Sequence, residues 1–245
     1  MTLKDEMVRW GNYLFRWRSY LPLLFLPVLM LALKKYRYLG GSETLDDLWD
    51  VFCVAIAVSG LSVRALIAGY VPASTSGRNT KRQEAQTLNT SGMYSIVRHP
   101  LYLGNFLMWL GVALFTHNWW LVLVAILAFW LYYERIIFAE EEFLSTRFGA
   151  EFEEWAGRTR AFVPSFRNWK PPSLPFSWKS VLAREHPTLF AMIVTFVLLD
   201  ATEDYFASTM PHVDLGWKLL LLAGLVVYTV LRWMKKRHLL SVDGR

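Results

Sequence analysis

The sequence predicts an all-α fold, a polytopic transmembrane helical bundle of about six spans. Hydrophobic residues make up 54% and aromatic residues 16% of the 245 residues, more than one soluble core requires. The apolar residues also gather into runs that approach the roughly 20 residues a helix needs to cross the hydrocarbon core of a bilayer. Six such runs can be read, at residues 19–33, 48–70, 101–116, 119–138, 188–206 and 215–233.

The N-terminal segment, MTLKDEMVRWGNYLFRW, comes before the first run. It lacks the basic, apolar and small-residue order of a cleavable signal, and its mixture of aromatic and basic residues predicts a retained helix at the membrane interface. The first run is short and carries Pro22 and Pro27, which predict a tilted, kinked or partly re-entrant helix. Pro100 and His117 bound the third run and keep it short, so this run is also predicted to be tilted, kinked or partly re-entrant. The alternative count is therefore five crossings.

Two polar segments, residues 71–99 and 139–187, interrupt the apolar pattern. The first is rich in Ser, Thr, Asn and Gly and is predicted to be a loop. The second begins as a helix, because its apolar residues recur at spacings of three and four, and then becomes a proline-containing stretch. The predicted organisation is an N-terminal interfacial helix with the first span (1–47), a core (48–165), a cytoplasmic linker (166–187) and an appended transmembrane hairpin with a basic tail (188–245).

The distribution of basic residues predicts the orientation of the chain. The net charge is +6, and 20 of the 26 lysines and arginines fall in the N-terminal segment, the two polar segments and the tail. Because basic loops stay on the cytoplasmic side, we expect both termini and both polar segments in the cytoplasm, with the chain in a bacterial inner membrane or an equivalent one. The positive net charge is then explained by the enrichment of basic residues in cytoplasmic loops, and we expect no nucleic-acid partner.

Only Thr116, His117 and Asn118 separate the third run from the fourth. Such a short connection forces an antiparallel helical hairpin. The hairpin brings residues near 98–104 alongside residues near 134–141 at the cytoplasmic face. We therefore expect two polar clusters, nearly forty residues apart along the chain, to form one site.

The first cluster is built around the charged triplet Arg98, His99 and Pro100 at the start of a span. A charged side chain this close to lipid costs free energy, so its presence indicates a function. Arg98 offers a planar cation for a carboxylate or phosphate, His99 a donor or acceptor near neutral pH, and Pro100 a helix start. Tyr102 adds a hydroxyl, and Gly104 permits close approach of a ligand. The alternative is that Arg98 and His99 only anchor the helix at the interface.

The second cluster contains Arg135, Glu140 and Glu141. Charged side chains beside lipid usually pair, so a local ion pair of Arg135 with Glu134 or Glu141 is the structural alternative to a functional role. The next residue, Glu142, is predicted to lie on a solvated helix face.

In order along the chain, these residues resemble the isoprenylcysteine carboxyl methyltransferase family and the related phospholipid methyltransferases, which are integral membrane enzymes. The likeness covers about residues 60–165 and rests on an ordered set rather than on the RHP triplet alone. The set comprises Gly92, Tyr94, Arg98, His99, Pro100, Tyr102, Gly104, Glu140, Glu141, Leu144, Phe148, Gly149, Glu151, Phe152, Trp155, Val163 and Pro164. Phe152 and Trp155 replace two tyrosines of the family pattern, so we expect them to pack rather than to supply hydroxyl groups.

The resemblance implies S-adenosyl-L-methionine as cofactor, in a pocket closed by the cytoplasmic helix and loops. The cofactor-binding residues that it implies are His99, Tyr102, Glu140, Glu141, Tyr94, Leu88, Pro100 and Gly104. The expected catalytic residues are Arg98, Arg135 and Glu141, with Arg135 as the nearest match to a family arginine that places the substrate. Methyl transfer from a sulfonium depends mainly on positioning and desolvation, and a nearby glutamate tolerates its positive charge.

The acceptor is expected to be a membrane lipid or a lipidated substrate that enters between helices. Clustered cations repel an ammonium group, so the arginines favour an anionic head, and we expect Arg64 and Arg78 to bind it. That head is a carboxylate, as in a prenylcysteine, or a phosphate, as in lipid A. Methylation of a phospholipid amine stays open, and positive-inside bias alone also explains the basic residues at 76–82.

Two other classes stay open. A sterol-type membrane reductase has a similar helical hairpin and would bind NADPH, while a non-enzymatic membrane scaffold would use its polar clusters structurally. The concentration of ionisable residues at one face favours the methyltransferase over the scaffold. Cys53 is the only cysteine, which excludes an intramolecular disulfide and a thiolate zinc cluster, and we expect no metal site.

The appended hairpin carries Asp200, Glu203 and Asp204 near its distal end. We expect these acids to mark the point where the fifth run reaches the far interface. Contact with a substrate head or with a dimer partner is the alternative.

Overall fold

The computed structural model describes residues 2–18, 20, 25–34, 39–72, 83, 85–208 and 213–242. Within those ranges the regular structure is helical, as the sequence predicts. The α-helices are α1 (Leu3–Trp17), α2 (Leu26–Leu33), α3 (Glu43–Tyr70), α4 (Pro100–Phe115), α5 (Trp119–Phe148), α6 (Ala150–Arg158), α7 (Trp178–Ser208) and α8 (Leu215–Lys236). Short 3-10 turns are η2 (Leu39–Gly41), η3 (Gly92–Ser95) and η4 (Phe166–Asn168).

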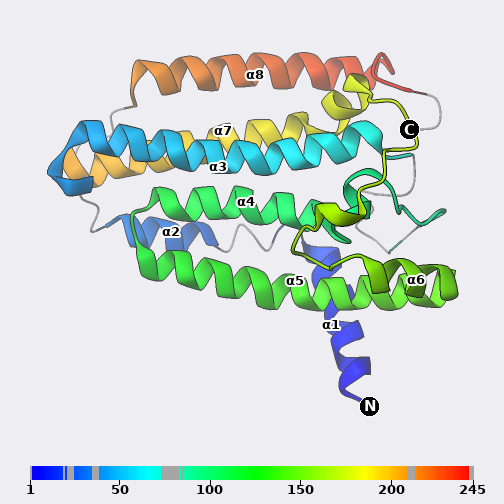
Figure 1. Cartoon of the computed structure of the whole chain (residues 1–245). Helices are drawn as coiled ribbons and strands as arrows, with labels where there is room; N and C mark the ends of the chain where they lie inside the picture. The colour runs from blue at the N-terminus through cyan, green and yellow to red at the C-terminus, as the bar shows by residue number, and fades with distance from the viewer. Residues whose placement is uncertain are drawn as a thin grey trace.

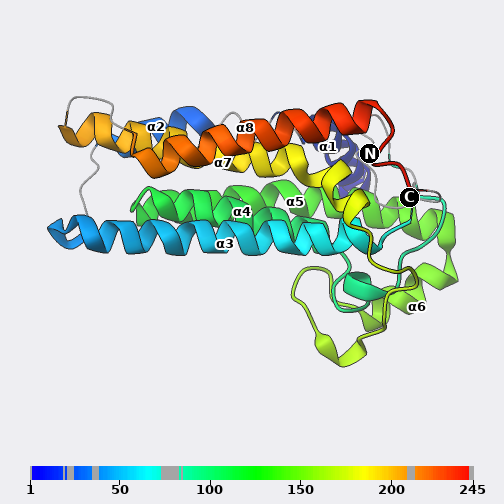
Figure 2. The same ribbon diagram turned by 90° about the horizontal axis from the view of Figure 1, so that it is seen from above.

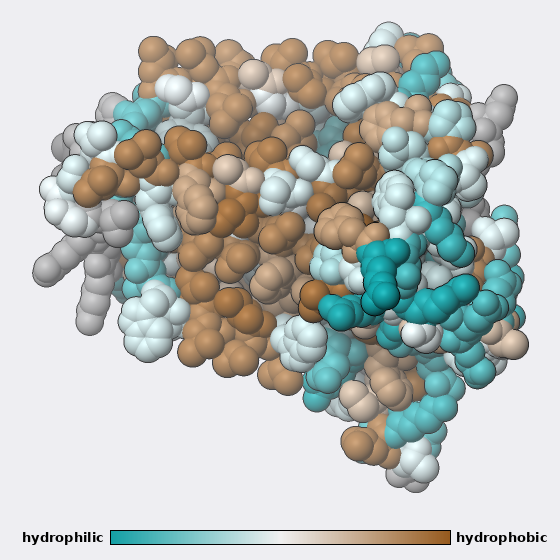
Figure 3. Space-filling model, viewed as in Figure 1, coloured by the Kyte–Doolittle hydropathy of each residue, from teal (hydrophilic) through white to brown (hydrophobic). Residues whose placement is uncertain are grey.

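Four of the described helices, α3, α5, α7 and α8, are long and apolar enough to cross a membrane. Helix α4 is equally apolar but has only 16 residues. Figure 1 shows these five helices running along one common direction. Figure 3 shows an apolar belt across the bundle and a gathering of hydrophilic residues at the end where α6 lies. The chain is an integral membrane protein with a polytopic helical bundle.

The bundle is built from successive helix pairs: α8 packs on α7, α7 on α3, α3 on α4, and α4 on α5 (Figures 1 and 2). Lipid offers helices no hydrophobic gain from association, so close van der Waals packing must hold them together. Glycines supply that closeness between α3 and α4. A Cβ on Gly60 would collide with the carbonyl oxygen of Gly104, and a Cβ on Gly111 would meet the backbone of Cys53 and Ala57.

Two buried clusters fill the interior. One lies near the end of the bundle that holds α2 and joins α2, α3, α4, α5 and α7. Its fully or largely buried members include Leu33, Cys53, Ala57, Phe115, Leu121, Phe196 and Leu199. The other joins α1, α4 and α5 through Phe15, Tyr102, Phe129, Tyr133 and Ile136. The second cluster includes the side chains of Tyr102 and Tyr133, which lie next to the polar site at the start of α4.

Helix α1 crosses α5 instead of running along the bundle (Figure 1). The crossing is tight at Gly11, where a Cβ would collide with the carbonyl oxygen of Arg135. Aromatic side chains remain exposed along α1, namely Trp10, Tyr13 and Trp17. Exposed aromatic side chains on a helix that crosses the bundle are typical of a helix at the membrane interface, and that location stays a prediction.

The first apolar run differs from the prediction of a span. Helix α2 has only eight residues, far short of the roughly 20 that a crossing requires. Pro27 stands in its first turn, where proline favours the start of a helix. Within the described ranges, the structure therefore has four long candidate spans and the shorter α4, which corresponds to the alternative count of five crossings.

Helix boundaries at the polar segments also differ from the predicted ones. Helix α7 begins at Trp178 rather than at 188, because its first turns are polar and carry no apolar run. The predicted cytoplasmic helix is two helices, the end of α5 and α6, which Gly149 separates at a backbone φ of +53°. The periodicity of apolar residues does not reveal this break. Phe152 and Trp155 of α6 are buried, so the spacing of apolar residues continues past Gly149.

Candidate active site

The α4–α5 hairpin forms as predicted and brings the two polar clusters together. The hydroxyl of Tyr102 donates to Glu140 Oε2 at 2.8 Å. His99 Nε2 lies 2.8 Å from Glu141 Oε1. The first residues at the start of α4 therefore contact two consecutive glutamates near the end of α5.

Arg98 joins the same cluster. Its Nε donates to Glu141 Oε1 at 2.7 Å, so one carboxylate oxygen serves both Arg98 and His99. Its Nη1 donates to the backbone carbonyls of Ala156, in the last turn of α6, and of Thr159, just after that helix. Arg98 thus holds Glu141 and also ties the end of α6 to the start of α4, which is more than the alternative of an interfacial anchor requires.

His99 is the centre of the cluster, with 4% of its side chain exposed. Besides the contact with Glu141, its Nδ1 is 3.6 Å from Glu140 Oε2. Burial acts to lower the pKa of His99, but hydrogen bonds and charge from the two glutamates outweigh it and raise the pKa above the ordinary value. The two carboxylates on either side of the ring therefore stabilise its protonated form.

Aromatic rings line the cluster on the side of the bundle. The rings of His99 and Tyr102 stack with centroids 5.6 Å apart, and Tyr102 contacts Tyr133 of α5 at 4.8 Å. The hydroxyl of Tyr133 accepts a hydrogen bond from Asn105 Nδ2 at 3.0 Å. The rings of Tyr102 and Tyr133 belong to the buried cluster of α1, α4 and α5, so the acidic pair borders the interior of the bundle on this side.

Asn105 continues the polar contacts toward the appended hairpin. Its Oδ1 accepts a hydrogen bond from Arg64 Nη1 at 2.6 Å. Arg64 in turn donates from Nε and Nη2 to the two carboxylate oxygens of Glu185 on α7, at 2.9 and 3.0 Å. A line of polar contacts therefore runs from α7 through α3 and α4 to α5.

The segment after α6 folds back over the start of α4. The amides of Arg98 and His99 donate to the carbonyls of Arg160 and Ala161, and Ser165 N donates to Ile96 O. Trp155 of α6 donates from Nε1 to the carbonyl of Tyr94 at 3.0 Å. The packing role predicted for Trp155 is confirmed, and this segment forms a cover on the polar side of the cluster.

Tyr94 lies in η3 under this cover. Burial raises the pKa of its hydroxyl, and the charge of Glu140 acts in the same direction. A small recess beside Tyr94 is lined by residues of α3, the segment before η3 and the segment after η4, among them Leu66, Tyr70, Asn89, Gly92, Met93 and Pro172. The structure gives Leu88 a half-buried position in this same region.

Other predicted site residues have different surroundings. Pro100 is fully buried at the first turn of α4. A Cβ on Gly104 would meet the side chain of Arg64, so the close approach that it permits is that of α3. Arg135 donates to Leu131 O on its own helix and is not bonded to the cluster, and Arg78 lies outside the described residues.

Three residues of the polar line were missed from the sequence: Asn105, Tyr133 and Glu185. Asn105 and Tyr133 lie one turn deeper into apolar runs than the predicted residues. A polar side chain inside a span is a signal for such residues, because it must find a partner there. Glu185 lies in the segment predicted as linker, so only the true start of α7 places it.

The two carboxylates of the cluster are paired but not fully enclosed. Arg98 and protonated His99 face Glu140 and Glu141, whose side chains are still 31% and 25% exposed. Such an arrangement holds two carboxylates in fixed positions beside aromatic rings. It suits the binding of a cationic or amine-bearing ligand.

Residues 54–151 match the family described as phospholipid methyltransferase. This range contains most of α3 and all of α4 and α5, and therefore Arg64, the Arg98–His99 pair and the acidic pair. The recess and the cover after α6 lie partly or wholly beyond it. The match thus coincides with the helices that build the cluster.

Several curated relatives share this region. The cobalt-zinc-cadmium resistance protein of Cupriavidus metallidurans is 36% identical over 127 residues, which cover 51% of this chain and 56% of the relative. The nickel-cobalt-cadmium resistance protein of Alcaligenes xylosoxydans xylosoxydans is 33% identical over 125 residues, with the same coverage of 51% and 56%. The protein-S-isoprenylcysteine O-methyltransferase of Schizosaccharomyces pombe is 32% identical over 85 residues, 35% of this chain and 36% of the relative.

The match therefore spans about half the length of the first two relatives and a third of the isoprenylcysteine enzyme. No solved structure matches the chain. The family match, the isoprenylcysteine relatives and the helical hairpin with its acidic pair agree with the resemblance seen in the sequence. Residues 54–151 are thus similar to the phospholipid methyltransferase family, and part of the chain is similar to isoprenylcysteine O-methyltransferases.

Proposed function

We propose that this chain is an S-adenosyl-L-methionine-dependent methyltransferase that acts on the polar head of a lipid or a lipidated substrate. The observation that carries the proposal is the single hydrogen-bonded cluster of His99, Tyr102, Glu140 and Glu141 at the end of the α4–α5 hairpin. The match of residues 54–151 to the phospholipid methyltransferase family supports the reaction class. The chemistry of the cluster supports the cofactor.

The donor set of the cluster fits this cofactor. Bound there, S-adenosyl-L-methionine supplies an electrophilic methyl group on a positively charged sulfur and also carries an ammonium group. Glu140 and Glu141 are carboxylates with part of their surface exposed, so they can accept hydrogen bonds from an ammonium group. The neighbouring rings of His99 and Tyr102 offer π-faces that stabilise a nearby positive charge.

The residues of the chain contribute mainly by position. Arg98 and His99 hold Glu141, and Tyr102 holds Glu140, so neither carboxylate has to be ordered when a ligand binds. A site prepared in this way lowers the entropic cost of reaching the reactive geometry. Burial of His99 and Tyr102 keeps water away from the bundle side of the site.

A carboxylate is the acceptor that the relatives favour, because several are named as protein-S-isoprenylcysteine O-methyltransferases. An ionised carboxylate is already a nucleophile and needs no general base, whereas an amine must first lose a proton. The two metal-resistance relatives are named for resistance and not for a reaction, so they do not bear on the acceptor.

The structure weakens one argument for an anionic head. Arg64 and Arg98 each pair with a glutamate, Glu185 and Glu141 respectively, so their charges are already balanced. A substrate role for Arg64 requires that it exchange a partner, and a role for Arg135 requires that it leave its own helix. The carboxylate therefore rests on the relatives, and a lipid phosphate such as that of lipid A is a second anion to be tested.

The active site and both termini are proposed to face the cytoplasm. The basic residues concentrate in the N-terminal segment, the polar segments and the tail. Figure 1 places α1, α6 and the C-terminal end of α8 toward the same end of the bundle. Positive-inside bias then assigns that end to the cytoplasm.

Transfer of a radiolabelled methyl group tests this function. Detergent-purified full-length protein is incubated with methyl-labelled S-adenosyl-L-methionine and, separately, N-acetyl-S-farnesylcysteine, lipid A and phosphatidylethanolamine. We expect label on farnesylcysteine, released as volatile methanol by mild alkali, as a carboxyl methyl ester requires. His99→Ala should abolish the transfer, and Glu142→Gln should not, because Glu142 is exposed and pairs with Lys4 away from the cluster.

The three acceptors also separate the alternatives. Label on lipid A alone would assign a phosphate acceptor, and label on phosphatidylethanolamine that resists alkali would assign amine methylation. Absence of label on every acceptor, with protein that is folded by thermal unfolding, would count against the proposed acceptors.

A further inference from the structure

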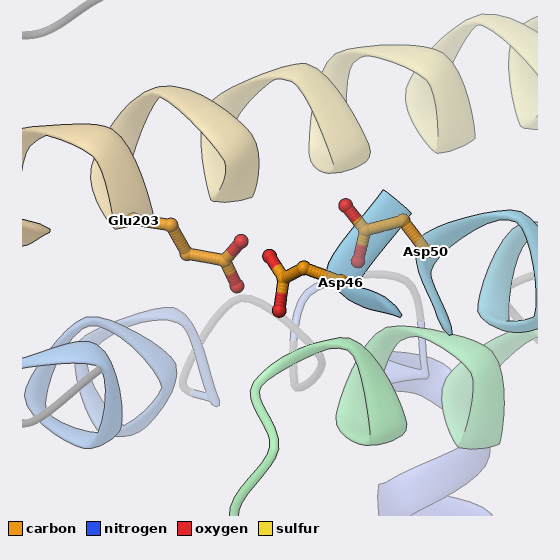
Figure 4. A group of neighbouring side chains, drawn as sticks. All are labelled: Asp46, Asp50 and Glu203. Carbon is orange, nitrogen blue, oxygen red and sulfur yellow. The ribbon is translucent and has the colours of Figure 1, made fainter. Parts of the chain in front are cut away.

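A second polar cluster lies at the other end of the bundle from the candidate active site. Asp46 and Asp50 stand one turn apart near the start of α3, and Glu203 reaches them from α7. One carboxylate oxygen from each residue lies within 4.8 Å of those of the other two. Figure 4 shows the three side chains pointing toward one another across the interface of the two helices.

The cluster is buried. Asp46 is 6% exposed and Glu203 is 4% exposed, while Asp50 is partly buried. Carboxylates placed this close repel each other strongly, and burial removes the water that would otherwise screen them. Three acids converging from two helices therefore need a compensating group.

Glu203 gives an independent indication of what that group is. Its Oε1 is buried, is aimed at the two aspartates and has no hydrogen-bond partner in the described part of the chain. Asp50 Oδ1 is likewise buried without a partner there. A buried carboxylate oxygen normally has a hydrogen-bond donor or a bound cation, so these atoms call for a ligand with positive charge.

A histidine lies beside one of the acids. His117, in the α4–α5 turn, places Nδ1 3.5 Å from Asp46 Oδ1. Its backbone φ is +55°, an uncommon value for a non-glycine residue, and its ring contacts Trp49 of α3. Side chains that hold a metal-binding carboxylate in place have this kind of position next to metal sites.

We propose that Asp46, Asp50 and Glu203 bind a divalent metal cation. A set made only of carboxylate oxygens suits the harder cations, Mg²⁺, Mn²⁺ and Ca²⁺, rather than metals that prefer sulfur or nitrogen. The cation balances the charge of the acids and fills the coordination of the two unpartnered oxygens. This site departs from the sequence-based expectation of no metal, and it gives the acids at the end of α7 a partner within the chain.

The site acts on the structure rather than on the reaction. Asp50 and Arg64 are 14 residues apart on α3, about 21 Å along a helix that rises 1.5 Å per residue. Helices α3 and α7 are joined at one end by the Arg64–Glu185 ion pair and, in this proposal, at the other end by the cation. The bound ion therefore fixes the appended hairpin against the core.

The test measures metal binding directly, without an activity assay. Detergent-purified full-length protein is stripped with a chelator and titrated with Mn²⁺, with free Mn²⁺ followed by electron paramagnetic resonance and stability followed by thermal unfolding. We expect one saturable Mn²⁺ per chain, competition by Ca²⁺ and Mg²⁺, and a higher Tm on binding. Glu203→Gln and Asp50→Asn should each weaken binding at least about tenfold, since each removes a charged ligand.

Asp47→Asn is the matched control, because Asp47 is an exposed acid on the same turn of α3. It should leave the affinity for Mn²⁺ within about twofold of the wild type, because an exposed carboxylate that is not a ligand acts on the site only through water-screened charge. Without metal, Glu203→Gln should raise the Tm above that of the stripped wild type, because it removes one of three repelling charges.

Two results would overturn the metal site. Equal Mn²⁺ affinity in the wild type, Glu203→Gln and Asp50→Asn would place any bound ion elsewhere. Failure of Mn²⁺, Ca²⁺ and Mg²⁺ to bind the stripped wild type, while Glu203→Gln still raises its Tm, would mean that the acids share protons instead.

Discussion

At the scale of single residues, the candidate active site depends on the charge of His99. Its buried ring lies between Glu140 and Glu141, with Arg98 and Tyr102 completing their contacts. A neutral ring would leave two nearby carboxylates with one fewer cation. Protonation of His99 therefore helps to hold the acidic pair in a fixed geometry.

The raised pKa of His99 predicts how stability depends on pH. A histidine whose pKa is higher in the folded state than its usual 6.5 stabilises the fold fully below that pH. The stabilisation is lost as pH rises through the folded-state pKa. We expect the Tm advantage of the wild type over His99→Gln to be largest near about pH 6 and to shrink toward about pH 9.

Thermal unfolding of the two proteins across this pH range checks the prediction. His238→Asn, in the exposed tail, is the control for loss of a histidine elsewhere. A Tm difference between wild type and His99→Gln that grows with pH would contradict the assigned charge.

The residues of the cluster were predictable because the chemistry and the topology agree. Arg98 and His99 are charges that lipid would penalise, and the three-residue turn at 116–118 brings the end of α5, with Glu140 and Glu141, alongside the start of α4. Asn105 and Glu185 were not predictable in the same way. Their partner, Arg64, lies on a third helix, and neither the order of helices nor the start of α7 follows from local pattern.

At the scale of helices, the contact of α3 with α4 positions the polar line. Gly60 lets α3 approach the carbonyl of Gly104, and this closeness places Arg64 within reach of Asn105. The contact involves backbone on both sides, so a larger residue cannot be accommodated by rotation of a side chain.

Gly60→Ala should therefore destabilise the protein by about 1–3 kcal/mol, the usual cost of inserting volume into a tight contact. The added Cβ would meet the carbonyl oxygen of Gly104 and, at 2.9 Å, Leu107 Cβ. Gly157→Ala in α6 is the matched control, because no atom lies within 4 Å of its Cβ position. Comparison of the two Tm values checks the prediction, and equal effects would speak against tight α3–α4 packing.

The Arg64–Glu185 pair links the core to the appended hairpin. Only 16% and 9% of the two side chains are exposed. Glu185→Gln leaves a largely buried arginine without its counter-charge, and we expect a loss of about 3–5 kcal/mol in the free energy of unfolding. Replacing both residues by methionine should cost less than the sum of the single replacements, because no buried charge is then left unpaired.

Reversible unfolding of the wild type, both single variants and the double variant gives the coupling energy. Strictly additive losses would show that α7 is not tied to α3 through this pair.

At the scale of the whole molecule, the chain has a polar end and an apolar belt (Figure 3). The polar end carries the candidate active site, α6 and the end of α8, while the acids of α3 and α7 lie at the opposite end (Figures 1 and 4). The two ends must therefore face opposite sides of the membrane.

Labelling of introduced cysteines tests the proposed orientation. The native Cys53 is fully buried and gives a low background. We expect an impermeant maleimide to label Arg158→Cys only in inverted vesicles and Leu215→Cys only in right-side-out vesicles, since both positions are exposed at opposite ends. The reverse pattern would place the site outside the cytoplasm.

Much of the architecture follows from the sequence because lipid restricts spans to helices. The long apolar runs of α3, α5 and α8 were therefore recognisable without knowledge of their contacts. The first run was overestimated because its apolar composition resembles a span, whereas α2 has only eight helical residues. The acids of α3 and α7 were seen separately, but their meeting depends on tertiary packing that no local pattern encodes.

Calorimetric titration of S-adenosyl-L-methionine into the detergent-purified chain, with NADPH titrated separately, tests the central claim most directly. The account predicts that the wild type binds S-adenosyl-L-methionine and not NADPH. His99→Ala and Glu141→Gln should each weaken binding about 10- to 100-fold, the scale of one charge-assisted hydrogen bond. Glu142→Gln, which alters an exposed pair with Lys4, should leave the affinity unchanged. Binding of NADPH alone, or S-adenosyl-L-methionine affinity that neither His99→Ala nor Glu141→Gln reduces, would contradict it.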